Sequence, residues 1–153
     1  MVKRRISGHV LHAAVAGIGG LWLCEVAGAF EPSVNYMLQC MGCHTPDGSG
    51  AAGRVPSIRS TLLPFSAVTA GRQFLVQVPG ASQSTLSDVE LADLLNWMIE
   101  NLSSEPRGVV FKRFTAAEVA GYRRKPLVEV RATREHLLNA TGIEEMMQSA
   151  KKQ

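Results

Sequence analysis

The stretch Cys40-Met41-Gly42-Cys43-His44 decides the fold expected for this chain of 153 residues. Two cysteines stand three positions apart, and a histidine follows the second one directly. Upstream, residues 34–44 predict a short helix that Pro32-Ser33 can start. Downstream, the run from Thr45 to Gly50 is a dense cluster of turn residues and predicts a loop. The motif is therefore expected where a helix meets a loop.

The C-x-x-C-H spacing favours one particular chemistry. Two thiols on a helical turn can each form a thioether with a haem vinyl group, and the adjacent histidine can then ligate the iron. A redox dithiol is the first alternative, but it is typical of a helix start in a βαβ setting, which the sequence lacks. A zinc site is the second, but beyond His44 the chain has no cysteine and only His136. We therefore predict one covalent haem c held by Cys40 and Cys43, with His44 as the proximal axial ligand.

Residues 1–29 are predicted to be a cleavable secretory signal peptide. Residues 3–5 are basic, residues 10–23 are mostly apolar, and Ala27-Gly28-Ala29 supplies the small residues of a cleavage site. An uncleaved membrane anchor is the alternative, but the run is shorter than the roughly 20 apolar residues that span a bilayer. We expect export to the periplasm of a bacterium, with membrane association not favoured.

Removal of this signal changes the charge of the chain. The whole chain carries 16 Lys+Arg and 13 Asp+Glu, and cleavage leaves 13 and 12, a net of only +1. A nucleic-acid partner therefore loses its main argument. The remaining charge is uneven, because residues 30–104 carry a net of −3 and residues 105–153 a net of +4. Such a dipole favours oriented docking on a partner protein.

Helical patterns continue beyond the motif. Residues 51–80 contain three prolines and predict an irregular segment with one short helix within 68–78. The clearest helix is expected over Asp88–Leu102, where Ser87 and Glu90 form a capping box and leucines recur on one face. We predict three parts: the signal peptide 1–29, a haem domain 30–104 and a basic helical C-terminal extension 105–153.

The extension shows three helix signals. Thr115 with Glu118, and Thr141 with Glu144, each have the spacing of a capped helix start. Pro126 favours a helix that runs to about Leu138.

Residues 33–103 resemble the class I cytochrome c family. The run from Cys43 to Gly50 is similar to the loop that follows the haem-binding histidine in that family, and Val55-Pro56-Ser57-Ile58 is similar to its P-x-L/I element. The resemblance implies an all-α fold around a covalent haem, and a hydrogen bond from the outer nitrogen of His44 to the Pro56 carbonyl. It also implies that Trp97, in the last helix of the family fold, packs against the first helix near Tyr36.

The distal axial ligand is where the sequence departs from the family. A methionine usually lies in the loop before the last helix, but residues 78–86 contain neither methionine nor histidine. Met98 is a candidate ligand, although a methionine on the apolar stripe of a helix is more typical of packing. His136 is a second candidate, and Met146 and Met147 are weaker ones.

We expect an electron carrier, and not an enzyme, that exchanges single electrons with a periplasmic dehydrogenase and a terminal oxidase. The missing loop methionine motivates an alternative, a haem-based sensor with an open or weakly held sixth site. The basic extension motivates another, a cytochrome subunit of a larger oxidoreductase.

Overall fold

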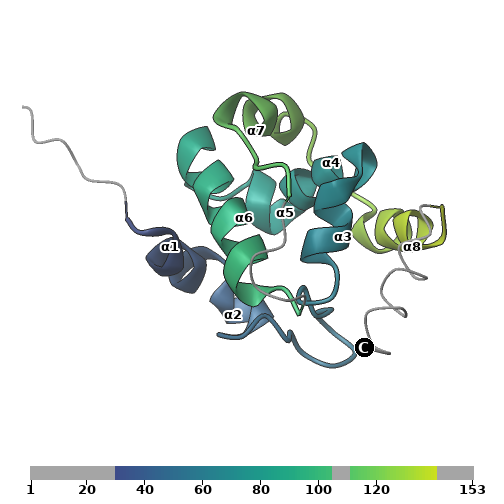
Figure 1. Cartoon of the computed structure of the whole chain (residues 1–153). Helices are drawn as coiled ribbons and strands as arrows, with labels where there is room; N and C mark the ends of the chain where they lie inside the picture. Colours follow the sequence, from purple (N-terminus) through teal and green to yellow (C-terminus); the bar gives the residue numbers. More distant parts are fainter. Residues whose placement is uncertain (1–29, 105–110, 141–153) are drawn as a thin grey trace, which may run out of the picture.

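The computed structural model describes residues 30–104 and 111–140 (Figure 1). Within these residues the protein consists of eight helices, and the only β-type pairing is an isolated bridge between Ala51 and Val55. The helices are α1 (Pro32–Gln39), α2 (Met41–His44), α3 (Leu62–Ala67), α4 (Thr69–Gln77), α5 (Pro79–Ser82), α6 (Asp88–Leu102), α7 (Ala116–Arg123) and α8 (Val130–Ala140). This architecture confirms the all-α fold class.

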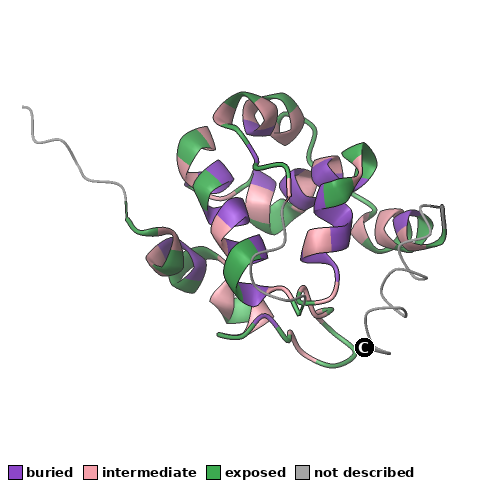
Figure 2. Cartoon of the chain, viewed as in Figure 1, coloured by how far each residue is buried: buried purple, intermediate pink, exposed green. Residues whose placement is uncertain are grey.

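Helix α6 is the longest of these helices, with 15 residues. The Ser87 hydroxyl accepts a hydrogen bond from the Glu90 amide, and the Glu90 carboxylate accepts one from the Ser87 amide. This is the predicted capping box. Figure 2 shows the buried side of the helix turned toward the other helices. The buried residues of α6 are Leu91, Ala92, Leu94, Leu95, Asn96, Met98, Ile99 and Leu102.

Residues 51–80 contain more helix than the sequence predicts. In place of one short helix, the chain forms α3, α4 and the start of α5. The prolines that suggested an irregular backbone lie where a helix tolerates them, because Pro64 is in the first turn of α3 and Pro79 is the first residue of α5. Amides in a first turn have no partner within their own helix, so these prolines remove no helical hydrogen bond.

Helices α3 and α4 pack closely through Gly71. A Cβ atom at Gly71 would lie 2.3 Å from the carbonyl oxygen of Phe65, so only glycine allows this approach. The Phe65 ring meets Phe74 edge-on, with the ring centroids 5.4 Å apart. The corner between α3 and α4 therefore forms one wall of the core.

Residues 111–140 share the core of residues 30–104. Phe114, Val119 and Leu137 are buried in the same hydrophobic cluster as the inner face of α6. The Asn96 side chain is also buried, and it pairs with the backbone of Phe114 through two hydrogen bonds of 3.1 Å and 2.7 Å. Buried polar groups of this kind are kept when both partners are satisfied. The segment that carries α7 and α8 is thus packed into the protein.

A buried ion pair joins α4 to α7. The guanidinium of Arg72, which is 4% exposed, donates to both carboxylate oxygens of Glu118 at 2.6 Å and 2.7 Å. Its remaining N–H groups donate to the carbonyls of Ser66, Lys112 and Arg113. The hydrogen bonds from Arg72 to the Glu118 carboxylate hold the pKa of Glu118 below its ordinary value, although burial acts in the opposite direction.

Of the two helices in the described part of the extension, α7 begins where the sequence predicts and α8 begins later. The Thr115 hydroxyl accepts a hydrogen bond from the Glu118 amide and starts α7, as the sequence predicts. Helix α8 begins at Val130 and not at Pro126. The Leu127 amide donates to the Gln77 carbonyl of α4, which engages this segment before the helix can start. The helix predicted from Thr141 lies outside the described residues.

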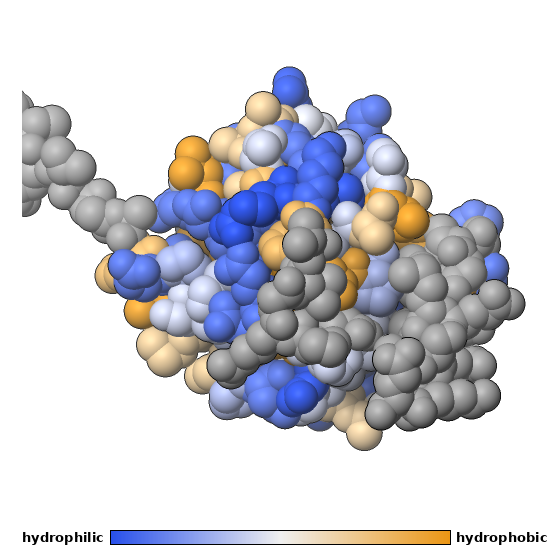
Figure 3. Space-filling view, viewed as in Figure 1, coloured by the Kyte–Doolittle hydropathy of each residue, from blue (hydrophilic) through white to orange (hydrophobic). Residues whose placement is uncertain are grey.

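The surface of the described residues is mixed in polarity. No helix among them is long and apolar enough to cross a membrane. On the face shown in Figure 3, the coloured apolar residues form small patches separated by polar ones. The large hydrophobic side chains that remain exposed are Phe30, Met37, Leu38, Val89 and Val128. The predicted signal peptide lies outside the described residues.

Candidate functional site

The two cysteines of the C-x-x-C-H motif lie where α1 passes into α2. The Cys40 carbonyl accepts hydrogen bonds from the amides of Cys43 at 3.1 Å and His44 at 3.0 Å, which closes one helical turn. Both thiols are free, with Cys40 half-buried and Cys43 exposed. Residues three apart lie on the same side of such a turn. Both sulfur atoms can therefore bond to one flat molecule.

The Cys40 thiol is uncharged at neutral pH. Burial, and then the neighbouring Cys43, raise the pKa of Cys40 to about 11. Cys40 also packs against the hydrophobic core. The neutral thiol therefore packs against the core as a small apolar side chain does.

His44 has one ring nitrogen turned inward. Its Nδ1 atom is buried and makes no hydrogen bond of normal length and angle. The Pro56 carbonyl lies beside the ring and raises its pKa, but burial has the larger effect and lowers the pKa of His44 overall. The imidazole is thus favoured in its neutral form, the form that ligates metals. An orphaned buried nitrogen with a carbonyl nearby is the arrangement that a ligating histidine uses on its outer side.

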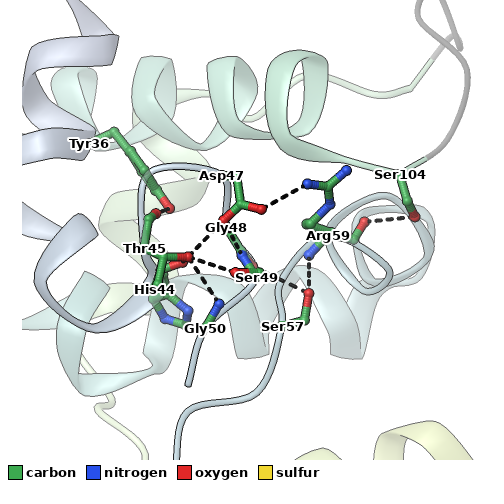
Figure 4. Close-up of polar contacts among 10 residues, drawn as sticks. All are labelled: Tyr36, His44, Thr45, Asp47, Gly48, Ser49, Gly50, Ser57, Arg59 and Ser104. Carbon is green, nitrogen blue, oxygen red and sulfur yellow. Dashed lines mark hydrogen bonds and ion pairs between the residues drawn. The ribbon is translucent and has the colours of Figure 1, made fainter. Parts of the chain in front are cut away.

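The loop after His44 is held from α1 by Tyr36 (Figure 4). The buried Tyr36 hydroxyl donates to the Thr45 carbonyl at 2.7 Å. Burial, followed by the charges of Cys40 and Asp47, raises the pKa of Tyr36 to about 12, so it remains a donor at neutral pH. Thr45 has a φ of 63°, which is unusual for a β-branched residue. The strained residue directly after His44 is therefore fixed from outside the loop.

Asp47 organises the outer part of the same loop. Its carboxylate accepts hydrogen bonds from the Thr45 hydroxyl and the Ser49 amide, and it pairs with Arg59 at 3.1 Å. The hydroxyls of Ser49 and Thr45 and the Ser49 amide hold the pKa of Asp47 well below its ordinary range. Figure 4 shows this network turned away from the imidazole of His44. The sequence predicts a loop here but not these partners, although the dense Thr, Asp, Ser and Gly content is their signal.

Gly50 lets the loop close on itself. It has a φ of 74°, and an added Cβ atom would lie 2.4 Å from the Val55 carbonyl oxygen and 2.8 Å from that of Pro56. The Gly50 amide donates to the His44 carbonyl at 3.1 Å. Gly50 thus connects the backbone of His44 to the backbone around Pro56.

Trp97 lies against α1. Its ring centroid is 5.7 Å from that of Tyr36, with the planes tilted by 42°. This contact joins α6 to the helix that carries Cys40 at its end. The same two helices therefore support both the turn from Cys40 to His44, which we call the attachment turn, and the loop after His44.

The candidate distal ligands are dispersed. Met98 is 7% exposed and belongs to the hydrophobic core of α6. His136 is exposed on α8. Met146 and Met147 lie outside the described residues. The loop that carries a ligand in the family is a short helix here, α5, followed by Gln83, and it presents no methionine or histidine.

Arg123 of α7 fixes the backbone of that loop. Its guanidinium donates to the carbonyls of Ser82 at 2.9 Å and Leu86 at 2.6 Å, and also to the Ser84 carbonyl. It pairs with Asp88 at 3.2 Å at the start of α6. The Gln39 side chain, next to Cys40, donates to Thr85 in the same loop at 3.2 Å. The loop is thus held between the attachment turn and the C-terminal extension.

The residues present fit a covalently attached haem. They offer two free thiols on one turn and a neutral imidazole with a buried outer nitrogen. Across residues 30–104 and 111–140, no group of three or more His, Cys, Asp and Glu side chains can hold a metal ion by itself.

Comparison with known proteins identifies the family. A cytochrome c-552 of Thermus thermophilus is 30% identical over 128 residues, which cover 72% of this chain and 83% of that protein. The chain belongs to the cytochrome c family. A second cytochrome c-552 of Thermus thermophilus is 30% identical over 107 residues, covering 58% of this chain and 82% of the relative. No family model matches the sequence.

Membership of the cytochrome c family implies a covalently bound haem c and an electron carrier rather than an enzyme. The similarity also reaches beyond residues 30–104, because these are about half of the chain and the match covers 72% of it.

Proposed function

We propose that this cytochrome carries single electrons in the bacterial periplasm between a dehydrogenase and a terminal oxidase. The observation that supports it best is the turn from Cys40 to His44, which presents two free thiols and a neutral imidazole in a member of the cytochrome c family. Cys40 and Cys43 would hold the haem by thioether bonds, and His44 would ligate its iron. The bound haem would supply an iron that alternates between the ferrous and ferric states.

The residues around His44 would orient it as a ligand. Its buried Nδ1 atom has the Pro56 carbonyl as a neighbouring acceptor. A hydrogen bond between them would fix the tautomer and the ring orientation, and it would make the imidazole a stronger donor to iron. Tyr36 and Gly50 hold the backbone on either side of this pair.

The packing of the site suits electron transfer. An electron moves with a low barrier when few atoms rearrange between the two oxidation states. The attachment turn is fastened to α6 by the Tyr36–Trp97 contact and to the loop 82–88 by the Gln39–Thr85 hydrogen bond. Both interactions limit the movement of atoms near His44 when the iron changes its oxidation state.

The proposed location rests on the sequence. The export pattern of residues 1–29 supports secretion to the periplasm, where c-type cytochromes and their redox partners can meet. The mature chain would carry a net charge of +1 with an uneven distribution. A partner of complementary charge would therefore meet it in a preferred orientation.

A redox titration of the secreted, mature protein tests this function. We expect a reversible one-electron wave with one electron taken up per chain. Cys43→Ser should retain Cys40 and lower the yield of covalent haem, whereas Ser49→Ala, in the loop that follows His44, should not. A protein that purifies with covalent haem but shows no reversible one-electron wave would contradict the carrier function.

A haem-based sensor of small diatomic ligands is the second candidate function. The observation in its favour is the loop 78–87, which offers no methionine or histidine, while Met98 is buried among apolar residues. Carbon monoxide added to the reduced protein separates the two functions. Ready binding would favour the sensor, and refusal would favour the carrier. Loss of the red methionine-to-iron absorption band in Met98→Ala would then assign the ligand.

The third alternative, a subunit of a larger oxidoreductase, loses its motivation in the structure. It takes the basic C-terminal extension as an interaction arm with little core of its own. Phe114 and Val119 are instead 3% and 0% exposed in the core of the protein.

A further inference from the structure

A cavity of about 700 Å³ lies between the loop 49–57 and helix α8. The lining residues that matter for its chemistry are Arg54, Pro56, Val130, Arg131, Arg134 and Glu135. We call this cavity the arginine cleft. Three arginines and one glutamate line it, so its lining carries a net positive charge. A cleft of this kind attracts anions.

The arginines of the cleft differ from the other arginines of the described residues. Four of those pair with carboxylates: Arg59 with Asp47, Arg72 with Glu118, Arg113 with Glu100 and Arg123 with Asp88. Within residues 30–104 and 111–140, the side chains of Arg54, Arg131 and Arg134 make no hydrogen bond or ion pair. Arg134 is half-buried, and only Glu135 from its own helix counteracts the resulting lowering of its pKa. The cleft therefore holds guanidinium groups whose natural partner, a carboxylate, is not supplied from the described chain.

The cleft is also close to the axial histidine. Pro56 lines it, and the Pro56 carbonyl lies beside the His44 ring. A molecule seated in the cleft thus touches the segment that packs on the proximal side of the site. Two other arginines of the extension, Arg113 and Arg123, are already paired with carboxylates.

We propose that the arginine cleft docks an acidic surface patch of a redox partner protein. The inference rests on the proposed electron-carrier function and adds the surface through which the carrier meets its partner. Carboxylates on the partner would pair with Arg54, Arg131 and Arg134, which act as planar two-pronged donors. Opposite charge would speed the encounter and orient it toward the loop of Pro56.

The test uses two small oxidants of opposite charge on the reduced haem protein. Ferricyanide is an anion, and tris(phenanthroline)cobalt(III) is a cation; each takes one electron from the ferrous iron, which becomes ferric as the oxidant is reduced. The cleft variant is the double substitution Arg131→Glu and Arg134→Glu. The control is Arg124→Glu with Lys125→Glu, an equal change in net charge on exposed residues outside the cleft lining.

We expect the ratio of the ferricyanide rate to the cobalt rate to fall roughly tenfold in the cleft variant at low salt. The control should change it much less, and high salt should remove the difference. A short poly-glutamate peptide, as a probe for an acidic patch, should slow the ferricyanide reaction of the wild type but not that of the cleft variant.

Equal changes in the cleft variant and the control would overturn the docking site. So would a shifted midpoint potential with an unchanged rate ratio, because the arginines would then hold the carboxylates of the protein's own haem. If neither reagent oxidises the reduced wild-type protein, the electron-carrier function itself fails, which is a different result from a rate that is insensitive to the cleft.

Discussion

Arg72 of α4 and Glu118 of α7 form a two-pronged ion pair in which the side chains are only 5% and 13% exposed. A charge inside a protein is retained when a partner and further hydrogen bonds compensate the loss of water. Both conditions hold here, since the remaining Arg72 donors reach backbone carbonyls. The pair therefore binds the C-terminal extension to the body of the cytochrome and leads to the first prediction.

Glu118→Gln should destabilise the protein strongly. The substitution leaves the Arg72 guanidinium buried without a carboxylate, which costs about 3 kcal/mol or more in the free energy of unfolding. Glu100→Gln is the matched control, because it breaks the exposed pair with Arg113 and should cost less than about 1 kcal/mol. Denaturant unfolding measures both, and equal effects would show that the buried pair has no special role.

The same pair predicts a pH dependence. The pKa of Glu118 is lowered in the folded protein from an ordinary value of 4.5. A group with a lowered folded pKa contributes stability that is full above its unfolded pKa and is lost as the pH falls toward its folded pKa. The stability difference between wild type and Glu118→Gln should thus be constant above about pH 5 and shrink in more acidic solution. A difference that grows on acidification would contradict this assignment.

Arg123→Ala should loosen the loop 82–88. Removing Arg123 frees the carbonyls of Ser82, Ser84 and Leu86. Charged hydrogen bonds contribute about 1.5–3 kcal/mol each, so local opening should become at least roughly tenfold more frequent. Amide hydrogen exchange followed by mass spectrometry measures this. Arg124→Ala is the control, because among the described residues the Arg124 side chain bonds only to the Ala120 carbonyl of its own helix. The same acceleration in both variants would refute the role of Arg123.

Gly50→Ala should disturb the site more than Gly53→Ala. Both glycines have a positive φ, 74° and 71°, but only at Gly50 would the new Cβ atom meet backbone oxygens. Gly53→Ala should cost about 1–2 kcal/mol for the backbone conformation alone. Gly50→Ala must also displace Val55 and Pro56, so it should cost more and shift the midpoint potential through His44. Thermal unfolding and a redox titration compare the two variants, and identical results would show that the close contact at Gly50 has no effect on stability or potential.

The sequence predicts the local features of this protein well because their causes are local. The capping box of Ser87 and Glu90 and the cap of Thr115 each depend on residues three positions apart. The C-x-x-C-H turn is also a local pattern, and it led to the family that the comparisons establish. Interactions between distant segments are harder to predict. Arg72 and Glu118 are 46 positions apart, and nothing in either neighbourhood indicates the partner.

Two predictions failed for related reasons. The prolines of residues 51–80 suggested irregular backbone, but Pro64 and Pro79 lie in first turns, where helices accept proline. Pro126 suggested a helix start, but the Leu127 amide is engaged by Gln77 of α4, so α8 begins at Val130. In both cases the position of a proline within its tertiary context decided its effect, and that context is absent from a local pattern.

Covalent attachment of one haem to Cys40 and Cys43 is tested most directly by the intact mass of the secreted protein. The protein is denatured, extracted with acidified acetone to remove any loosely held pigment, and weighed by mass spectrometry. We predict a mass equal to the mature chain plus one haem, with the pigment retained by the protein. A colourless protein with the mass of the bare chain, and the pigment in the acetone, would contradict the claim.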